Sequence, residues 1–327
     1  MLHRFLKIKK QLLGQETLRY EDIHAPVVKS INRKYSFSEA EMLIKSSQKP
    51  LGNDYSESLN KAFADHWMDI YPNKGKTSNA HMINVYSDHP FILLDYNGSF
   101  GSVATITHEL GHGLNSYFAV KKQPKAMAEY PIFLAEIPSA FNENLLIEFL
   151  LKSEKDDQSK LYLLDWCLES VMGSVFDNTL LAEFELTMHK HIESGQPLTA
   201  EWLDQTYLAL VRQYYGQQQG ICEVGDYIQN EWIGIPHLLF NYCIYQYSIG
   251  RIASLALSDM VLQEGPRGAK RYMVFQSAGG SDYPLETLRK AGVDLSHPDA
   301  ANAAFSSVNS ILIEMEKLIV RNNNQNF

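Results

Sequence analysis

Cysteine is scarce in this sequence. The 327 residues include only Cys167, Cys222 and Cys243, an odd number with no Cys-x-x-Cys spacing. Such a set predicts neither a disulfide framework nor a thiolate zinc site, and it fits a reducing compartment. The sequence also lacks any run of 18 apolar residues, so we expect no helix that spans a membrane.

Basic residues are also fewer than acidic residues. Lys and Arg number 29 against 38 Asp and Glu, which gives a formal net charge of -9. The one dense basic cluster is Lys7–Lys10, so a nucleic-acid partner is not expected. In residues 1–14 the apolar side chains alternate with Lys and Arg, without the continuous apolar core of a signal peptide. We therefore expect a cytoplasmic protein that binds neither nucleic acid nor membrane.

Helical periodicity dominates the chain. Residues 54–68 place Leu59, Phe63 and Trp67 four positions apart, which forms an amphipathic stripe. The same periodicity predicts helices over Leu145–Leu151, Leu161–Val175, Leu180–Ile192, Trp202–Tyr215, His237–Leu262 and Ala304–Val320. We expect a mainly α fold and, since no clear boundary is visible, one domain over residues 1–327.

Two short segments depart from this pattern. His81–Tyr86 and Phe91–Tyr96 are rich in β-branched and aromatic residues and are separated by Ser-Asp-His-Pro, which predicts a β-hairpin. The Asn-Gly pair that follows ends the second strand, and Ser99 or Ser102 is placed to cap the next helix. The small sheet therefore precedes a helix directly.

That helix carries the sequence Thr-His-Glu-Leu-Gly-His. His108 and His112 are four residues apart, so a helix presents both imidazoles on one face, where they can bind one ion. Glu109 points to an adjacent part of this face and can reach a metal-bound water without being a ligand. Gly111 costs about 1 kcal/mol relative to Ala within a helix, which argues against a chance match.

These residues predict a zinc-dependent hydrolase. A catalytic zinc ion needs three protein ligands and one open position. It lowers the pKa of a bound water to roughly 7, so that hydroxide forms at neutral pH. Glu109 would accept the proton as the general base and then deliver it to the departing amine.

A third zinc ligand is expected downstream. Glu136 lies in the next strongly helical stretch, and two antiparallel helices would bring it to the histidines. Pro138 is tolerated only in the first turn of a helix, so this helix should begin near Ala135 or kink there. Glu143 lies two turns from Glu136 on the same face, which suits a hydrogen bond to a ligand histidine, although a solvated side chain is the alternative. The rival carboxylates are Glu129, Glu143 and Glu148.

With these motifs the sequence resembles the oligoendopeptidase F and thimet oligopeptidase family of zinc peptidases. It resembles the oligoendopeptidase F branch more closely. The resemblance rests on colinear segments between residues 20 and 299. They read NKGKTSNAHMINVYSDHPFILLDYNGSF, ITHELGHGLNSYFA, AEIPSAFNENLL, AEFELTMHKHIESGQPLT, IPHLLFNYCIYQYSIG and SAGGSDYPLETLRKAGVDL. The resemblance implies one zinc ion held by His108, His112 and Glu136, with Glu109 as the catalytic base. It also implies a helical channel that admits short unstructured peptides.

The resemblance further implies a group of tyrosines and a histidine that faces the zinc. Here the group consists of His237, Tyr242 and Tyr245 as catalytic side chains, with Tyr247 in contact with the substrate. A phenol or imidazole would donate a hydrogen bond to the developing oxyanion. Core packing is the alternative, because Tyr242 and Tyr245 lie three residues apart. The glycine-containing segment Gly216–Gly234 would be a mobile loop that lets this wall close on the substrate.

The predicted hairpin has a candidate role in substrate binding. A strand edge in front of a zinc helix can bind an extended peptide through backbone hydrogen bonds. Met82–Tyr86 would form that edge, with Tyr86 as a substrate contact. A purely structural hairpin is equally consistent with the sequence.

The chain differs from the family in size. Members carry a long N-terminal helical region before the part matched here, so residues 1–327 are expected to form the zinc metallopeptidase catalytic domain. The N-terminal region is then missing or supplied by a partner chain. Two alternatives to an active peptidase stay open: a catalytically weak peptide-binding half that needs this region, and a metallohydrolase that acts on a non-peptide amide.

Overall fold

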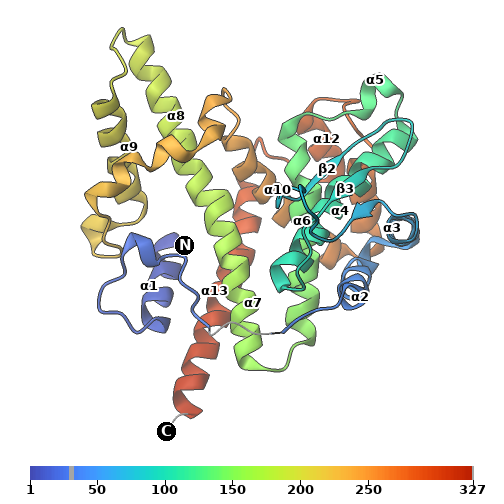
Figure 1. Cartoon of the computed structure of the whole chain (residues 1–327), viewed down its shortest axis with the longest axis horizontal. Coiled ribbons are helices and arrows are strands. Elements are labelled where there is room, and N and C mark those ends of the chain that lie inside the picture. Colours follow the sequence, from blue (N-terminus) through green and yellow to red (C-terminus); the bar gives the residue numbers. More distant parts are fainter. Residues whose placement is uncertain (29–32, 326–327) are drawn as a thin grey trace. The chain divides into compact units, whose positions relative to one another are not determined.

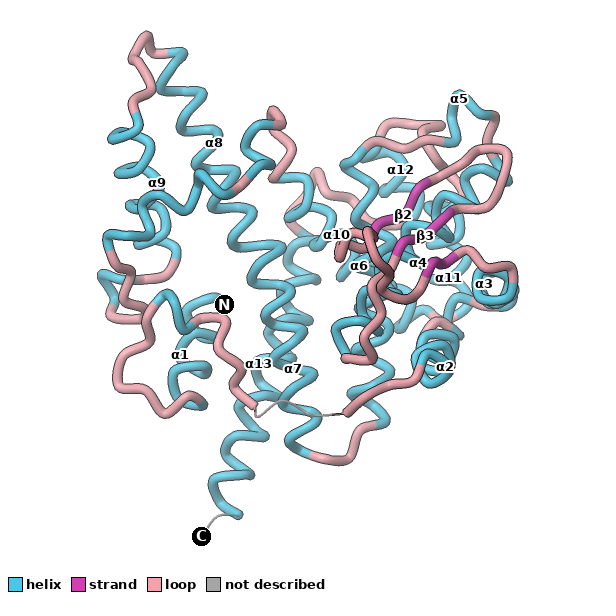
Figure 2. Tube along the Cα trace, in the orientation of Figure 1, coloured by secondary structure: helices cyan, strands magenta, loops and turns pink. Residues whose placement is uncertain are grey.

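The computed structural model describes residues 1–28 and 33–325. Within these residues it contains thirteen α-helices and three short strands, which confirms the mainly α fold with a small sheet. The chain folds into two compact units, which we describe separately (Figures 1 and 2). The expectation of a single catalytic domain stays a prediction.

Unit 1 is helical and consists of Met1–Ile31, Lys155–Ile249 and Val308–Phe327. Its complete helices are α1 (Leu2–Leu12), α7 (Asp157–Val171), α8 (Asn178–Glu193) and α9 (Ala200–Tyr214). A π-helical turn, Met172–Asp177, joins α7 to α8. Two further helices, α10 (Tyr245–Glu264) and α13 (Asp299–Gln325), contribute to both units.

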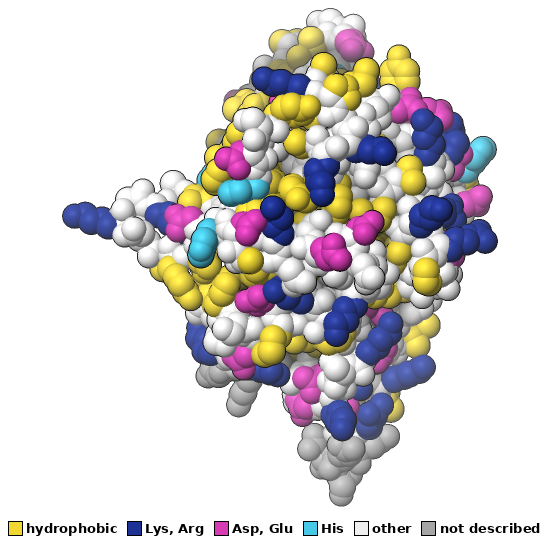
Figure 3. Space-filling view, turned by 90° about the vertical axis from the view of Figure 1, so that its right-hand side faces the viewer, with side chains coloured by type: hydrophobic (Ala, Val, Ile, Leu, Met, Phe, Trp, Pro, Cys, Tyr) yellow, Lys and Arg dark blue, Asp and Glu magenta, His cyan; other side chains and the backbone are white. Residues whose placement is uncertain are grey.

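Unit 2 consists of Asn32–Glu154 and Gly250–Ser307. Its complete helices are α2 (Phe37–Ser47), α3 (Asn53–Ala64), α4 (Phe100–Lys122), α5 (Lys125–Ala128), α6 (Ile132–Ser153), α11 (Pro266–Gln276) and α12 (Pro284–Ala291). The three strands also belong to this unit. On the face drawn in Figure 3, Lys and Arg side chains are interspersed with Asp and Glu side chains.

The predicted hairpin is present in unit 2, with shorter strands than expected. β2 (His81–Ile83) pairs antiparallel with β3 (Phe91–Leu93), and Met82 lies opposite Ile92. A third strand, β1 (Met68–Asp69), pairs parallel with β3. It escaped prediction because two residues show no periodicity. The strand order β1-β3-β2 leaves β2 at an edge of the sheet, as a peptide-binding strand requires.

The pairing of α4 with α6 depends on a very close backbone approach. A Cβ atom on Gly111 would lie 2.5 Å from the Pro138 carbonyl oxygen and 2.6 Å from the α-carbon of Ser139. Glycine is therefore required sterically, despite its low helix propensity. Ser99 caps α4 because its Oγ accepts a hydrogen bond from Ser102 N at 3.2 Å, which confirms one of the two predicted caps.

Several predicted helix boundaries were wrong. α3 ends at Ala64, short of Trp67 in the predicted stripe, and α7 ends at Val171 rather than Val175. α6 begins at Ile132 rather than near Ala135, so Pro138 lies inside the helix, in its second turn. The proline removes one N–H near the helix start, and packing of the long helix outweighs that loss. The helix predicted from His237 begins only at Tyr245, because Tyr242 has φ of 50°, which a right-handed helix does not allow.

The segment Gly216–Gly234 contains defined turns. Gln217–Gln219 and Asp226–Gly234 are 3-10 helices, and Trp232 Nε1 donates a hydrogen bond to Asp204 Oδ1 at 2.9 Å. Its mobility stays a prediction. Among the helices within residues 1–28 and 33–325, none combines the length and apolar character that a membrane crossing requires.

Candidate metal centre

Two helices of unit 2 bring His108, His112 and Glu136 together. Both histidines come from α4, and Glu136 comes from the start of α6. The Nε2 atoms of His108 and His112 are 3.2 Å apart. Glu136 Oε2 lies 3.5 Å from the first of these nitrogens and 3.6 Å from the second. The three potential ligand atoms thus form a nearly equilateral triangle.

The triangle has the dimensions of a zinc site. Tetrahedral zinc with bonds of about 2.0–2.2 Å separates neighbouring ligand atoms by about 3.3–3.6 Å. The separations of 3.2, 3.5 and 3.6 Å agree with this value. Two imidazoles and one carboxylate are also a donor set of catalytic zinc sites, in which the fourth position stays open. The residues therefore fit the ion that the motif predicts.

The charges of the triangle suit a cation. Burial opposes protonation of His108, but hydrogen bonds to Glu136 and Glu143 outweigh it and raise its pKa to about 10. Burial and the neighbouring His108 lower the pKa of His112 to about 4. Burial would raise the pKa of Glu136, but the two histidines outweigh it and lower this pKa to about 2. Glu136 and Glu143 thus stabilise a positive charge on His108, and a zinc ion would replace the proton that carries this charge.

Glu143 supports the ring of His108 from behind. Its Oε1 lies 3.0 Å from His108 Nδ1, and its Oε2 accepts a hydrogen bond from Arg251 Nη1 at 3.2 Å. Arg251 is only 5% exposed. Burial raises the pKa of Glu143, but His108 and Arg251 outweigh it, so the pKa lies below its ordinary value. The predicted hydrogen bond is therefore present, and the solvated alternative for Glu143 is wrong.

The rival carboxylates lie outside this group. Glu129 is exposed, and Glu148 pairs with Lys152 at 3.5 Å on the surface of α6. Of the carboxylates that the sequence offered, the structure brings only Glu136 and Glu143 to the histidines.

Glu109 is buried beside the triangle without belonging to it. Its side chain is 6% exposed, and Oε2 has no hydrogen-bond partner among the described residues. Burial raises the pKa of Glu109 to about 7, with Glu136 and Glu143 adding to the effect against the opposing charge of His108. An unpartnered buried oxygen is costly, so a small polar molecule at this position would be stabilised.

Arg251 was not predicted from the sequence. It is the only charged residue between Ser248 and Leu257, a stretch of apolar and small residues. Arg is rarely buried unless it is paired, so an isolated Arg in such a helix indicates a buried acidic partner. This signal could have led to Glu143.

The predicted oxyanion group belongs to unit 1. The rings of His237 and Tyr247 meet edge to face, 5.7 Å apart. Tyr242 N donates a hydrogen bond to Glu185 Oε1 at 2.6 Å. Tyr245 is 38% exposed, so the core-packing alternative is wrong for this residue. Because the metal triangle belongs to unit 2, contact between these side chains and the metal centre stays a prediction.

Tyr86 is held near the end of α4. Its hydroxyl donates a hydrogen bond to the carbonyl oxygen of Gln123 at 3.3 Å. Its contact with substrate also stays a prediction.

Comparison with known proteins agrees with the geometry. Residues 1–307 match the profile described as Peptidase family M3. The chain is 37% identical to oligopeptidase PepF of Bacillus subtilis over 98% of its own length and 48% of that protein. Group B oligopeptidase PepB of Streptococcus agalactiae is also 37% identical, over 98% and 53%. The crystal structure of oligoendopeptidase-F from Enterococcus faecium superposes with a TM-score of 0.72 at 33% identity, over 98% and 50%.

The chain spans about half the length of the curated relatives that it matches. The family profile and both identities, taken with the His, His and Glu triangle, lead to one conclusion. The chain belongs to peptidase family M3.

Proposed function

We propose that this chain is a zinc-dependent metalloendopeptidase that hydrolyses short, unstructured oligopeptides. The observation that carries the proposal is the triangle of His108, His112 and Glu136 with the buried carboxylate of Glu109 beside it. The names of the relatives, oligopeptidase and oligoendopeptidase, support this class of substrate.

The triangle would hold the zinc ion. Zinc, when bound there, supplies a Lewis acid that polarises the scissile carbonyl and acidifies a water molecule. Glu109 accepts a proton at its unpartnered Oε2 and then passes it to the leaving amine. A general base works best when its pKa is near the working pH, and burial raises the pKa of Glu109 to about 7.

Glu143 and Arg251 keep His108 ready to bind the ion. A carboxylate only accepts hydrogen bonds, so Nδ1 of His108 must donate to Glu143 Oε1. This leaves the lone pair of a neutral imidazole on Nε2, which is the atom that faces His112 and Glu136.

The remaining roles concern the substrate. We assign oxyanion stabilisation to His237, Tyr242 and Tyr245, whose N–H and O–H groups would donate to the oxygen of the tetrahedral intermediate. Tyr247 and Tyr86 would contact substrate side chains. The free edge of β2 would bind the peptide backbone, because an edge strand has unpaired N–H and C=O groups.

The first test is hydrolysis of an internally quenched short peptide by the 327-residue chain. We expect cleavage that a zinc chelator abolishes and added zinc restores. Cleavage that the chelator does not affect would contradict the proposal.

A second candidate follows from the coverage of the relatives. The chain matches only 48% of oligopeptidase PepF, so it could bind peptides while needing a further segment for turnover. Protein that holds zinc and binds peptide without cleaving it would support this candidate. Activity on addition of the other half of a relative would then identify the missing part.

A further inference from the structure

The sheet of unit 2 lies directly on the helix that carries both histidines of the metal triangle. A Cβ atom on Gly113, the residue after His112, would lie 3.3 Å from Ile92 Cδ1 and 3.7 Å from Pro90 Cβ, so β3 packs against α4 beside the second histidine. β2 also contacts α4, and it forms the free edge of the sheet next to β3 (Figure 1). Neighbouring strands are about 4.8 Å apart, so a peptide added to this edge stays within reach of α4.

β2 is an open edge. Natural edge strands are commonly protected from further pairing by Lys or Pro residues or by a bulge. β2 consists of His81, Met82 and Ile83, and all three residues pair in register with β3, so the strand itself carries none of these protections. Its edge therefore suits the addition of an extended peptide.

The two faces of β2 differ in their surroundings. Met82 lies opposite Ile92, which is 2% exposed and packs on α4, so this pair belongs to the inner face of the sheet. Ile83 lies opposite Phe91 on the outer face, where these side chains are 55% and 43% exposed. Two large apolar side chains thus lie side by side in solvent next to the open edge.

Aromatic neighbours hold Phe91 in place. Its ring lies 4.5 Å from the ring of His89, which in turn stacks at 5.5 Å on the buried ring of Trp67. Ile83 is the neighbour of Phe91 on the side of the free edge. Ile83 is therefore the apolar side chain of the outer face that an added strand would meet first.

The residues of a strand added to β2 would alternate between the two faces. The residue opposite Ile83 would point to the outer face, with its Cβ atom about 4.5–5.5 Å from that of Ile83. An apolar side chain at this position would cover Ile83 and remove apolar surface from water, which is favourable. A polar side chain would gain nothing from this neighbour.

We propose that Ile83 determines specificity, by favouring an apolar side chain at the substrate position that lies opposite it on β2. The inference rests on the proposed function and names a class of substrate: extended peptides with a Leu-like residue at this position. A cross-strand pair such as Ile83 and Phe91 also stabilises a hairpin, so specificity and stability are measured separately.

Paired peptides measure the preference. Each pair shares an internally quenched, Ala-based sequence of eight residues and carries either Leu or Asn at one position, because these side chains have nearly the same shape. The pairs cover every position in turn, and mass spectrometry of the products aligns each position with the scissile bond. At the position opposite Ile83 we expect the kcat/KM of the zinc-loaded chain to favour Leu by at least about tenfold.

Two substitutions identify that position. Ile83→Thr keeps a β-branched strand residue and should lower the preference for Leu there to less than about threefold. Ile83→Lys should make Glu preferred to Leu at the same position, because opposite charges on directly opposite strand residues attract. The preferences at the other positions should not change. A side chain that served only the hairpin would lower the Tm and change the rates of all peptides by one factor, and this result would overturn the proposal.

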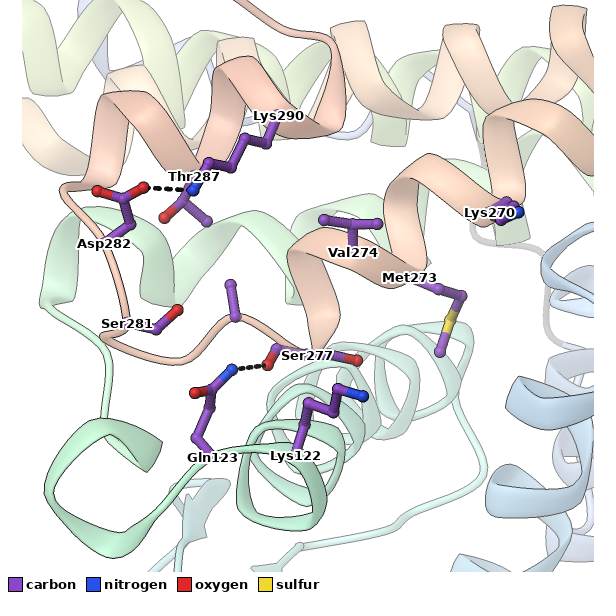
Figure 4. Close-up of a pocket in the computed structure, with 11 residues that line it drawn as sticks. Lys122, Gln123, Lys270, Met273, Val274, Ser277, Ser281, Asp282, Thr287 and Lys290 are labelled. Carbon is purple, nitrogen blue, oxygen red and sulfur yellow. Dashed lines mark hydrogen bonds and ion pairs between the residues drawn. The ribbon is translucent and has the colours of Figure 1, made fainter.

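Val274→Thr is the matched control. Val274 is a β-branched apolar residue of unit 2 with a similar exposure of 49%, but it projects from α11 instead of the sheet (Figure 4). Its replacement should leave the preference for Leu unchanged at every position. Equal losses of preference in Val274→Thr and Ile83→Thr would contradict a local role of Ile83.

Peptide binding separates this inference from the proposed function. The Kd of each labelled peptide is measured by fluorescence anisotropy in the Glu109→Gln background, in which the peptides should stay intact. If the unmodified chain cleaves no peptide but Ile83→Thr abolishes the preference for Leu in Kd, the proposed function is wrong and the role of Ile83 stands. If peptides are cleaved with preferences that neither Ile83 variant changes, the function stands and the inference is wrong. Failure to bind any of the peptides would also refute the inference.

Discussion

Glu143 Oε1 lies 3.0 Å from His108 Nδ1. Glu143, which we do not propose as a metal ligand, thus fixes the ring of His108, which we do propose as one. The other oxygen of Glu143 accepts a hydrogen bond from the buried Arg251 at 3.2 Å. The orientation of His108 therefore depends on a chain of two hydrogen bonds that runs from α10 through α6 to α4.

This relationship predicts the effect of substitutions behind the metal. Glu143→Gln should weaken zinc binding by about 10- to 100-fold, because the ring loses its ionised acceptor. Arg251→Met should weaken it in the same direction but less, since the carboxylate remains. Competition with a chromophoric chelator measures both affinities.

Glu148→Gln is the matched control for these two variants. Glu148 lies on the same helix as Glu143 but pairs with Lys152 at the surface, and its replacement should leave the zinc affinity unchanged. If Glu143→Gln binds zinc as tightly as the control, the supporting role of Glu143 is wrong.

Replacement of the proposed base should stop turnover but leave the metal in place. Glu109→Gln keeps the size of the side chain and removes its ability to accept the proton, so we expect turnover to fall by at least about 100-fold. The zinc content, measured by atomic emission, should stay at that of the unmodified chain. Glu129→Gln, at an exposed position, serves as the control. Full turnover by Glu109→Gln would rule out its role as the base.

The proposed oxyanion donors can be tested one hydroxyl at a time. Tyr242→Phe and Tyr245→Phe should each lower turnover, by about 10- to 1,000-fold if the lost group is a main donor, and leave the zinc content unchanged. Peptide cleavage and metal analysis on the same preparation give both readouts. If both variants retain full turnover, neither tyrosine forms the wall that we propose.

The close packing at Gly111 predicts that a larger side chain there destabilises the fold. In Gly111→Ala the new Cβ would lie 2.5 Å from the carbonyl oxygen of Pro138, which is backbone and cannot rotate away. We expect a loss of about 1–3 kcal/mol or more in the free energy of unfolding, because α4 and α6 must move apart. Urea unfolding followed by circular dichroism measures this change, and zinc binding should weaken with it.

Gly173→Ala is the matched control for this substitution. Gly173 lies in a helical turn, and its new Cβ would meet nothing closer than Asp177 Oδ2 at 3.9 Å. Its free energy of unfolding should change by less than about 0.5 kcal/mol or rise slightly. Because helix propensity favours Ala over Gly at both positions, equal losses in both variants would mean that close packing against Pro138 does not account for the effect at Gly111.

Asp165 of α7 should make the stability of unit 1 depend on pH. Burial raises its pKa from 3.8 to about 6, although Lys9 opposes the shift and Glu169 adds to it. Its Oδ1 is buried without a partner among the described residues. The folded state therefore binds this proton more tightly than the unfolded state, and stability from this group falls as the pH rises from about 4 to about 6.

Asp165→Asn removes that dependence. At pH 8 the variant should be more stable than the unmodified chain by about 1–2 kcal/mol, after allowance for solvent screening, because the buried charge is absent. Near pH 3.5, where the carboxyl is largely protonated in both states, the two proteins should have nearly equal stability. Urea unfolding at both pH values checks the prediction, and a variant that is less stable at pH 8 would contradict it.

The fold was predictable where the sequence is periodic. Residues 54–68 and 180–192 have clear apolar stripes, and helices α3 and α8 cover most of these segments, although α3 ends at Ala64 and leaves Trp67 outside the helix. The unpredicted helices α1, α2, α5, α11 and α12 lie in segments for which no helix was proposed. Several of these helices are short. α11 and α12 each begin with a proline after a turn, and in the sequence such a pair indicates an interruption more strongly than the start of a helix.

The failures at Tyr242 and Pro138 have a common cause. Tyr242 and Pro138 occur in stretches with helical periodicity, but their backbones follow tertiary interactions. Tyr242 adopts φ of 50° where its N–H is bonded to Glu185, and Pro138 is accepted inside α6 where that helix packs against Gly111. Interactions between segments distant in sequence outweighed local preference at both positions.

By itself the sequence determined the candidate metal-binding residues of the zinc helix. The spacing of His108 and His112 on one helical face, with Glu109 beside the first, follows from the period of the α-helix and needs no partner segment. The hairpin and the Ser99 cap are likewise local and were predictable. Only the tertiary structure decided which carboxylates reach the histidines, because Glu136 and Glu143 meet α4 through the packing of two helices over Gly111. The pairing of Arg251 with Glu143, across 108 residues, depends in the same way on long-range packing, because an isolated Arg in an apolar stretch indicates that an acidic partner exists but not which one it is.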